Sequence, residues 1–198
     1  MSWRPETLSI LNHPHPALRF ESVPVPKIDA RLRETVAEMF ELMYTADGIG
    51  LAANQVGIPR RLFVVNLSGG ERDPAEEFVF INPTITSRRG SAVAEEGCLS
   101  LPGVYGDVRR PEAITVQAYG LDGQPFEMKL DDLPARVVQH ETDHLDGRMF
   151  IDRMSENDLA KIAAQVEEFE IEYAAQCETG KLAEEPELVR QVEAMARA

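Results

Sequence analysis

The spacing of apolar side chains predicts a long amphipathic helix near the N-terminal end of the chain. Between residues 28 and 44, apolar side chains recur at intervals of three and four, the period at which side chains share one face of an α-helix. This face consists of Ile28, Leu32, Val36, Met39, Phe40 and Met43. We expect the helix to pack this face against a core, and the turn-rich segment 12–26 before it to be an irregular arm.

After Gly48 the pattern changes to short apolar runs that are typical of β-strands. The runs are rich in Val, Ile and Phe, are bounded by Gly, Pro and Asn, and cover residues 62–67, 78–81, 113–119 and 126–130. Asp122-Gly123 separates the last two runs, and a glycine there supplies the positive φ that a tight hairpin turn requires. The sheet is therefore expected to be antiparallel, at least in part.

A shorter helix is predicted over residues 131–147. Asp131 or Asp132 can cap its N-terminus, and Pro134 is tolerated in its first turn. Gly147 can end it, because glycine readily adopts the left-handed conformation found after many helices. Val137 and Val138 are its most apolar positions before the segment that carries the candidate chemistry.

A longer helix is expected to begin after Ser155, which is followed three residues later by an aspartate, as in a capping box. Apolar residues at helical spacing continue until Gly180 and Pro186 interrupt the pattern. Residues 151–198 contain twelve acidic and five basic side chains, and so carry −7 of the formal net charge of −14. We therefore expect residues 176–198 to form an acidic C-terminal extension that is helical or partly disordered.

Composition narrows the class of protein. The chain of 198 residues is 43% hydrophobic and 27% charged, as in globular proteins, and no apolar run approaches the length of a membrane helix. No apolar stretch of a signal peptide follows the first residues, so we expect a cytoplasmic protein without a membrane partner. The net charge of −14 repels polyanions and argues against sequence-specific binding of nucleic acids.

The most informative local pattern is His140-Glu141-Thr-Asp-His144 on the shorter predicted helix. Residues four apart lie on one helix face, so both imidazoles can point at one cation. A metal-dependent hydrolase needs two neutral nitrogen ligands and a carboxylate that takes a proton from water, and Glu141 supplies this carboxylate. The alternative is a solvated helix face with incidental histidines. Because the motif holds two of only four histidines in the chain, we favour a metal site.

A catalytic metal of this kind uses three protein ligands and keeps one position open. Downstream of His144, no Glu or His stands at the spacing found in the zinc proteases. Cys98 is the best remaining candidate, because the flanking glycines and proline predict a tight turn that leaves a strand and exposes its thiol; the alternative is a buried structural thiol. His13 and His15 are each followed by proline and have no third ligand nearby, so we interpret them as loop or packing residues.

A third segment, residues 48–57, is rich in small side chains that allow another part of the chain to approach closely. Gln55 in this segment offers an amide donor of the kind that holds a developing oxyanion. Phosphate binding by its glycines is the alternative. We reject this alternative because the segment lacks a Lys-Ser/Thr ending and follows a helix rather than a strand.

Together, the three segments resemble the signature motifs of peptide deformylase in their order and approximate spacing. They read Gly48-Ile-Gly-Leu-Ala-Ala-Asn-Gln55, Glu96-Gly-Cys-Leu-Ser100 and Gln139-His-Glu-Thr-Asp-His-Leu-Asp-Gly147. The resemblance spans roughly residues 8–170. It implies an α+β fold in which partly antiparallel β-sheets pack around a central helix carrying His-Glu-x-x-His, with an N-terminal and a C-terminal helix. A single catalytic domain is expected over residues 1–175, followed by the acidic extension 176–198.

The resemblance also implies a reaction. The enzyme would remove the N-formyl group from the N-terminal formyl-methionine of nascent polypeptides and release formate. Cys98, His140 and His144 would bind one divalent metal ion, and Glu141 would act as general base and then as general acid. Fe²⁺ is implied as the native metal, although one thiolate and two imidazoles also accommodate Zn²⁺, Ni²⁺ or Co²⁺.

Further roles are implied around this centre. The side chain of Gln55 and the backbone amide of Leu99 would stabilise the oxyanion of the tetrahedral intermediate. Gly50 would hydrogen-bond the peptide backbone of the substrate, and Ile49 and Val137 would help to line the methionine pocket.

One further pair is implied beside the metal, and two positions depart from the family pattern. Arg110 would pair with Glu96 in support of the metal ligands. Tyr105 stands where well-known bacterial members have an arginine, which leaves contacts with the peptide beyond methionine undetermined. Arg136 stands at a position that is often apolar; its stem could cover the pocket while its head stays in water.

Two alternative functions and one partner remain open. A metallopeptidase would share His-Glu-x-x-His, and a non-catalytic, metal-stabilised binding module would need neither Glu141 nor Gln55. The expected partners are N-formylmethionyl peptides and nascent chains, which places the protein close to the ribosome. The acidic tail offers no basic surface for docking to ribosomal RNA.

Overall fold

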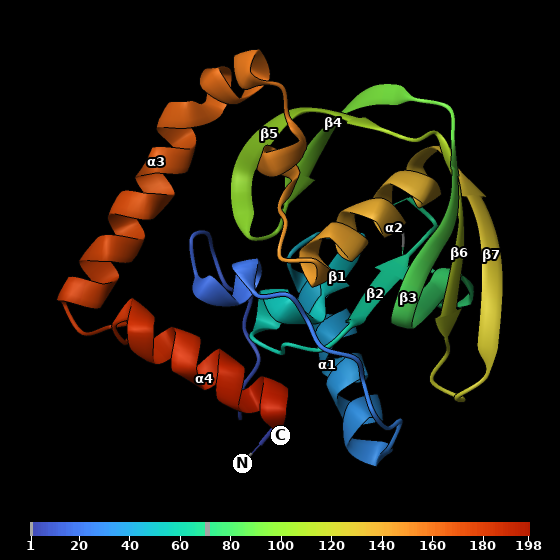
Figure 1. The fold of residues 1–198 in the computed structure, drawn as a ribbon, viewed down its shortest axis with the longest axis horizontal. Helices are drawn as coiled ribbons and strands as arrows, with labels where there is room; N and C mark the ends of the chain where they lie inside the picture. Colours follow the sequence, from blue (N-terminus) through green and yellow to red (C-terminus); the bar gives the residue numbers. More distant parts are fainter. Residues whose placement is uncertain (1, 70–71) are drawn as a thin grey trace.

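Helix α2 (Asp132–Leu145) lies in the middle of the molecule, and the other elements surround it (Figure 1). The computed structural model describes residues 2–69 and 72–198. The strands are β1 (Gly50–Ala52), β2 (Leu62–Asn66), β3 (Glu77–Arg89), β4 (Ala92–Cys98), β5 (Leu101–Arg110), β6 (Ala113–Tyr119) and β7 (Pro125–Asp131). The other α-helices are α1 (Ala30–Thr45), α3 (Glu156–Glu178) and α4 (Glu185–Arg197). Short 3-10 turns lie at η1 (Pro16–Arg19), η2 (Ala53–Val56), η3 (Pro74–Glu76) and η4 (Phe150–Arg153).

Two antiparallel sheets form the β part of the structure. One sheet has the strand order β1-β2-β3-β6-β7, and the other consists of the hairpin β4-β5. In the hairpin between β6 and β7, Gly123 adopts φ 80°, in the left-handed region where glycine carries no steric penalty. The predicted α+β class is therefore confirmed, and so is the antiparallel pairing.

β1 and β5 were not predicted, the strand expected before the turn at Cys98 is β4, and β3 is longer than predicted. β1, β4 and β5 escape the apolar pattern because β1 has only three residues and the hairpin strands are rich in Gly, Glu and Arg. Half of the side chains of β4 and β5 face solvent, so their apolar content is low. β3 continues to Arg89, well past the predicted end at residue 81. The outer half of this strand is exposed and polar, so it has no apolar run that would predict it.

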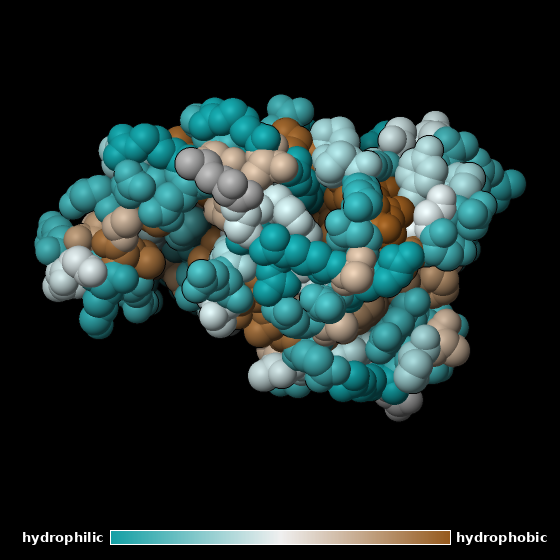
Figure 2. Space-filling view, turned by 90° about the horizontal axis from the view of Figure 1, so that it is seen from below, coloured by the Kyte–Doolittle hydropathy of each residue, from teal (hydrophilic) through white to brown (hydrophobic). Residues whose placement is uncertain are grey.

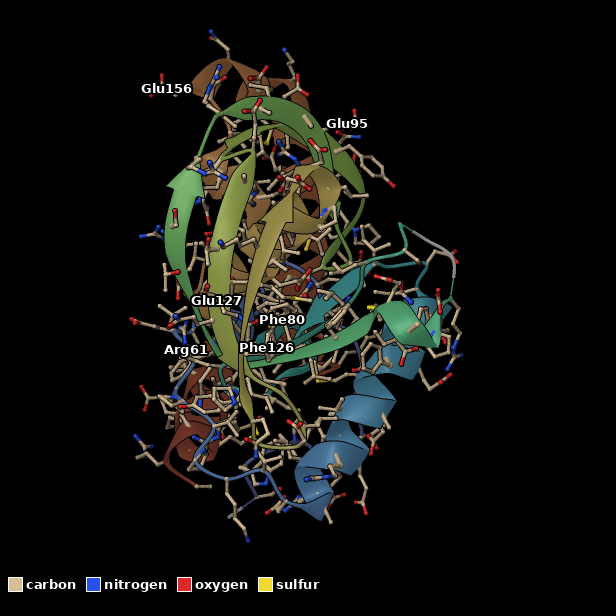
Figure 3. All side chains as sticks on the ribbon, turned by 90° about the vertical axis from the view of Figure 1, so that its right-hand side faces the viewer. Arg61, Phe80, Glu95, Phe126, Glu127 and Glu156 are labelled. Carbon is tan, nitrogen blue, oxygen red and sulfur yellow. The ribbon has the colours of Figure 1, made fainter. Side chains whose placement is uncertain are left out.

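The core is divided between the faces of the larger sheet. The apolar face of α1, including Met39 and Met43, packs with β2 and with Leu51, Ala53 and Val56 of the 48–57 segment. On the other side, Phe80 of β3 stacks on Phe63 at a centroid distance of 4.8 Å and meets Phe126 of β7 edge to face at 5.2 Å (Figure 3). Val138 of α2 joins this second cluster, which anchors the central helix to the sheet.

The ends of α2 and α3 follow their predicted signals with one exception. Gly147 ends α2 with φ 68° and donates its N–H to the carbonyl of His144 at 3.0 Å. Ser155 caps α3 by accepting the N–H of Asp158 at 3.2 Å. Asp131 occupies the cap position of α2, but within the part of the chain that the structure describes its side chain makes no capping hydrogen bond.

The C-terminal helices form an arm along one side of the molecule (Figure 1). α3 begins beside β5, extends away from it, and α4 then returns to lie beside η1. Leu188 and Val192 of α4 are buried, and Arg60 donates to the carbonyl groups of Met195 and Ala196 at 3.3 and 3.1 Å. Figure 2 shows mostly hydrophilic side chains with small apolar patches on one face. Within the described residues, no helix is both long and apolar enough to cross a membrane.

Candidate active site

Helix α2 brings His140 and His144 onto one face. Their positions are four residues apart, and their ring centroids lie 4.9 Å apart with an angle of 75° between the ring planes. His144 is buried, and His140 is half-buried at the edge of a cavity. The two imidazoles are therefore close enough to bind one metal ion, as the helical spacing predicts.

Cys98 reaches these histidines from the end of β4. The hairpin register shifts between Gly97 and Cys98, so that Cys98 pairs with Leu101 across a tight turn. The Cys98 Sγ atom lies 3.2 Å from His144 Nε2. One ligand atom from each of Cys98, His140 and His144 lies within 4.8 Å of the other two. Strand β4 and helix α2, far apart in sequence, thus build one cluster.

The chemistry of these atoms fits a divalent transition-metal ion. His140 Nδ1 lies 3.0 Å from Glu96 Oε2, so the hydrogen bond engages Nδ1 and leaves Nε2 as the ligand atom. One thiolate and two imidazole nitrogens are ligands that such ions bind, in the number that a catalytic site uses. No other group of three possible ligands of this kind occurs among the described residues.

Glu96 is buried and is held by three side chains. Arg110 donates from Nε to Oε1 at 2.6 Å and from Nη2 to Oε2 at 2.9 Å, and Arg136 donates from Nη1 to Oε1 at 2.6 Å. Burial alone would raise the pKa of Glu96, but the hydrogen bonds with His140 and Arg110 hold this pKa well below its usual range. Glu96 is therefore ionised and presents a fixed negative charge to the Nδ1–H of His140.

Glu141 lies next to the cluster in a confined position. Its carboxylate is buried, and Oε2 has no hydrogen-bond partner among the described residues. Burial raises the pKa of Glu141 to about 7. A carboxyl group whose pKa lies near neutral pH can both accept and release a proton, which is the property a general base and acid requires.

Three contacts orient the side chain of Gln55. Its Oε1 accepts the backbone N–H of Ala52 at 2.8 Å, which directs the amide nitrogen toward the turn after β4. There Nε2 lies 3.1 Å from Ser100 Oγ and 3.4 Å from Cys98 Sγ. The amide donor of Gln55 therefore points at the cluster. Leu99 lies between Cys98 and Ser100 in the same turn.

A cavity of about 540 Å³ opens beside these groups. Gly50, Ile49 and Val137 line it together with Cys98, Leu99, His140 and Glu141. Tyr105 also lines this cavity and is 57% exposed, so it stands at the mouth. Glu95 on β4 is a second exposed side chain at this rim (Figure 3). The cavity has room for a side chain and leads to the candidate ligands.

The head of Arg136 does not stay in water, contrary to the expectation from sequence. Its side chain is only 12% exposed, because its guanidinium group turns inward to Glu96 and to two backbone carbonyl groups of the hairpin. Arg136 also lines the cavity. The ion pair with Glu96 provides the charge compensation that a buried guanidinium needs.

Sequence reasoning missed two polar residues that support the cluster. Asn54 donates from Nδ2 to the carbonyl of His144 at 2.5 Å and so ties the end of α2 to η2. Asp143 accepts from Arg110 at 2.7 Å and from Arg153 at 2.5 and 3.1 Å. Both lie inside the recognised motifs, but only the fold shows their partners. His15, interpreted as a packing residue, is buried and accepts the N–H of Ala17 at 3.1 Å.

Comparisons with known proteins agree with this geometry. Residues 7–160 match the family model described as Polypeptide deformylase. A peptide deformylase of Rhodopirellula baltica is 47% identical over 184 residues, covering 93% of this chain and 91% of the relative. One of Chromobacterium violaceum is 46% identical over 163 residues, covering 82% of this chain and 96% of the relative.

Solved structures show the same relationship. The crystal structure of the peptide deformylase of Plasmodium falciparum superposes with a TM-score of 0.82 at 38% identity, covering 84% of this chain and 98% of that chain. The matched regions include all three motifs and the strands and helix that carry them. The chain belongs to the polypeptide deformylase family.

Proposed function

We propose that this protein is a metal-dependent peptide deformylase, which removes the N-formyl group from the formyl-methionine of nascent polypeptides and releases formate. The observation that carries this proposal is the position of Glu141. Its buried carboxylate lies beside the Cys98, His140 and His144 cluster and lines the same cavity. A proton-transfer group, a metal-binding cluster and space for a substrate therefore coincide.

The reaction adds water to the formyl carbon and breaks the bond between that carbon and the amide nitrogen. A divalent ion held by Cys98, His140 and His144 would supply Lewis acidity, which lowers the pKa of water from about 15.7 toward about 7. Glu141 takes the proton of the attacking water and then delivers it to the departing amino group. Formate leaves with the water oxygen, and the peptide leaves with a free amino terminus.

The oxyanion that develops on the formyl oxygen needs hydrogen-bond donors. We assign this role to the side-chain amide of Gln55 and to the backbone N–H of Leu99. Gln55 is held by Ala52, so little reorganisation is required when charge develops. Loss of one such donor typically costs about 10² to 10³ in rate.

The cavity is assigned to the methionine side chain and the first peptide bond of the substrate. Ile49 and Val137 provide apolar surface for the thioether chain, and the backbone of Gly50 would hydrogen-bond the peptide. At the rim, Tyr105 replaces the arginine of well-known bacterial members and offers an aromatic surface to residues that follow methionine.

We propose Fe²⁺ as the native metal, with Zn²⁺, Ni²⁺ and Co²⁺ as ions that the same ligands accept. Protein purified without oxygen should contain iron and lose activity in air as the iron or the Cys98 thiolate oxidises. Nickel-substituted protein should keep its activity in air. An enzyme that is fully active with zinc and indifferent to oxygen would overturn the assignment of iron.

The decisive test compares formyl-Met-Ala-Ser with acetyl-Met-Ala-Ser under identical conditions, with metal analysis of the same protein. A deformylase hydrolyses the formyl peptide and leaves the acetyl peptide nearly untouched. Release of free amino acids from unblocked Met-Ala-Ser would instead identify a metallopeptidase. Bound metal without hydrolysis of any of the three peptides would indicate a metal-stabilised binding module.

We further propose that the enzyme acts in the cytoplasm, where formylated chains leave the ribosome. The acidic C-terminal arm does not favour direct contact with RNA. Sedimentation of the protein with ribosomes should therefore be unchanged by removal of residues 181–198. Loss of sedimentation on truncation would show that this arm contacts the ribosome.

A further inference from the structure

Arg136 occupies an unusual place between the two elements that carry the candidate metal ligands. It lies on α2, four residues before His140. From there Nη1 donates to Glu96 Oε1 at 2.6 Å and to the carbonyl of Val108 at 3.0 Å. Nη2 donates to the carbonyl of Ala92 at 3.1 Å. One guanidinium group therefore ties the helix to both strands of the β4-β5 hairpin.

The charges around Glu96 explain why a second arginine is needed there. Arg110 is shared between two buried carboxylates, because its Nη1 also donates to Asp143 at 2.7 Å. Asp143 also forms an ion pair with Arg153. Arg136 provides the equivalent second partner for Glu96. When a buried carboxylate loses an ion-pair partner, its uncompensated charge destabilises the folded state, and its remaining contacts shift.

We propose that Arg136 is a positioning residue. It holds Glu96 against His140, and it fixes the position of the β4-β5 hairpin, with Cys98, relative to α2. This inference rests on the proposed metal site. Glu96 Oε1 is shared by Arg110 and Arg136, while Oε2 faces His140 Nδ1. Arg136 therefore limits rotation of the carboxylate away from the histidine. Its contacts with Ala92 and Val108 limit movement of the hairpin that ends in Cys98.

Loss of the Arg136 guanidinium group should therefore weaken retention of the metal ion, in addition to any effect on substrate binding. Partners of metal ligands typically change metal affinity by about 10- to 100-fold when they are removed. Arg136 acts one contact farther away, so we expect an effect at the lower end, about tenfold. Because Arg136 also lines the cavity, a change in KM could arise from the pocket. Metal release separates the two effects.

The experiment uses Arg136→Met, which keeps the length of the stem and removes the guanidinium group. The matched control is Arg109→Met on β5, whose side chain is exposed and makes only a 3.5 Å contact with Ser91 among the hydrogen bonds of the described residues. Both proteins are loaded with nickel, and its release to an excess of chelator is followed by absorbance. We expect release to be about tenfold faster in Arg136→Met and unchanged in Arg109→Met.

A second measurement shows whether Arg136 acts through Glu96. Release is compared for Arg136→Met, Glu96→Gln and the double variant, since coupled residues give effects that do not add. We expect the double variant to release nickel hardly faster than Glu96→Gln. Independent, multiplicative effects would contradict positioning through Glu96, and an unchanged release rate in Arg136→Met would overturn the proposal.

A second variant and a control on the wild-type protein cover the cases in which Arg136→Met does not fold or the proposed function is wrong. If Arg136→Met is unfolded at the assay temperature, Arg136→Lys is used; it retains one charge but not the planar fork, so release should be intermediate. Release from Arg136→Lys at the wild-type rate would then contradict the proposal. Wild-type protein that binds nickel but does not hydrolyse formyl peptides would refute the proposed function and leave this test of Arg136 valid.

Discussion

Glu141 and Gly50 stand so close that a Cβ atom on Gly50 would come within 2.4 Å of Glu141 Oε1. The approach is possible only because residue 50 has no side chain. Glu141 is buried, so its carboxylate has little freedom to move aside. The glycine motif and the helical motif are therefore fitted to each other, which neither motif reveals by itself.

Gly50→Ala should displace the Glu141 carboxylate and lower kcat/KM by about 100-fold or more, since a small misplacement of a catalytic group costs about this much. The matched control is Gly120→Ala in the turn between β6 and β7, whose added methyl would approach the Asp122 carboxylate at 2.9 Å, outside the cavity. Hydrolysis of formyl-Met-Ala-Ser provides the measurement. Equal losses in the two variants would show that the contact with Glu141 is unimportant.

Glu141→Gln should keep the metal and lose most of the activity. The amide is nearly the same size as the carboxylate but cannot accept the proton of the attacking water, so kcat should fall by about 10² to 10⁴. Metal content and kcat are measured on the same preparation. Glu127→Gln on the exposed side of β7 is the control and should retain wild-type values. Substantial turnover by Glu141→Gln would exclude Glu141 as the proton acceptor.

Cys98→Ser should weaken metal binding, because a serine hydroxyl is a poorer ligand than a thiolate for ions of this softness. After dialysis against a chelator, the variant should contain much less metal than the wild type. Cys177→Ser is a matched control, since Cys177 lies on α3, where its Sγ–H donates to the carbonyl of Ala183 at 3.5 Å. Equal metal content in Cys98→Ser and wild-type protein would remove Cys98 from the proposed ligands.

His15 should make the fold sensitive to mild acid. Burial lowers the pKa of His15 to about 4, so the unfolded chain, with a histidine pKa of about 6.5, binds the proton more readily. The contribution to stability is therefore complete above about pH 6.5 and is lost as the pH falls toward 4. Between pH 7.5 and 5 this group should lower the free energy of unfolding by about 2 kcal/mol.

His15→Asn isolates this effect, because asparagine can still accept the N–H of Ala17 but does not titrate. Denaturant unfolding of both proteins at pH 7.5 and pH 5 gives the two differences in free energy. The variant should lose about 2 kcal/mol less than the wild type over this interval. Identical losses would mean that His15 is not responsible.

Leu188→Ala should loosen α4 without affecting the site. Removal of a buried leucine side chain typically costs about 2 kcal/mol or more, and Leu188 is among the buried contacts of α4. Amide hydrogen exchange in residues 185–197 should accelerate by about 30-fold, which corresponds to that free energy. Leu159→Ala on the exposed side of α3 is the control. Unchanged exchange in α4 would show that Leu188 does not anchor the helix.

Local patterns predicted much of the secondary structure because each depends on neighbours in sequence. The face of α1 follows from the helical period of its apolar residues, and the strands β2, β6 and β7 follow from short apolar runs bounded by turn residues. The caps at Ser155 and Gly147 follow from the preferences of single residues. β4 and β5 lack such a pattern, because glycine and charged residues dominate strands that are half exposed.

In the candidate site, too, some features follow from local sequence and others depend on the tertiary structure. The spacing of His140 and His144 was sufficient to place both on one face of a helix, since the period of the α-helix is a local property. Their meeting with Cys98 depends on how the β4-β5 hairpin folds over α2, which no local rule describes. The motif resemblance indicated this meeting, and its geometry comes from the tertiary structure.

The sequence by itself determined the helical His-Glu-x-x-His pattern, the class of fold and the residue types available for catalysis, because these are encoded within short stretches. Only the tertiary structure decided that Arg136 turns inward to Glu96, that Arg110 is shared with Asp143, and that Gly50 leaves room for Glu141. These relationships join residues from different elements. They are set by which charges must be neutralised when the hairpin and the central helix are buried together, and a linear pattern does not contain that information.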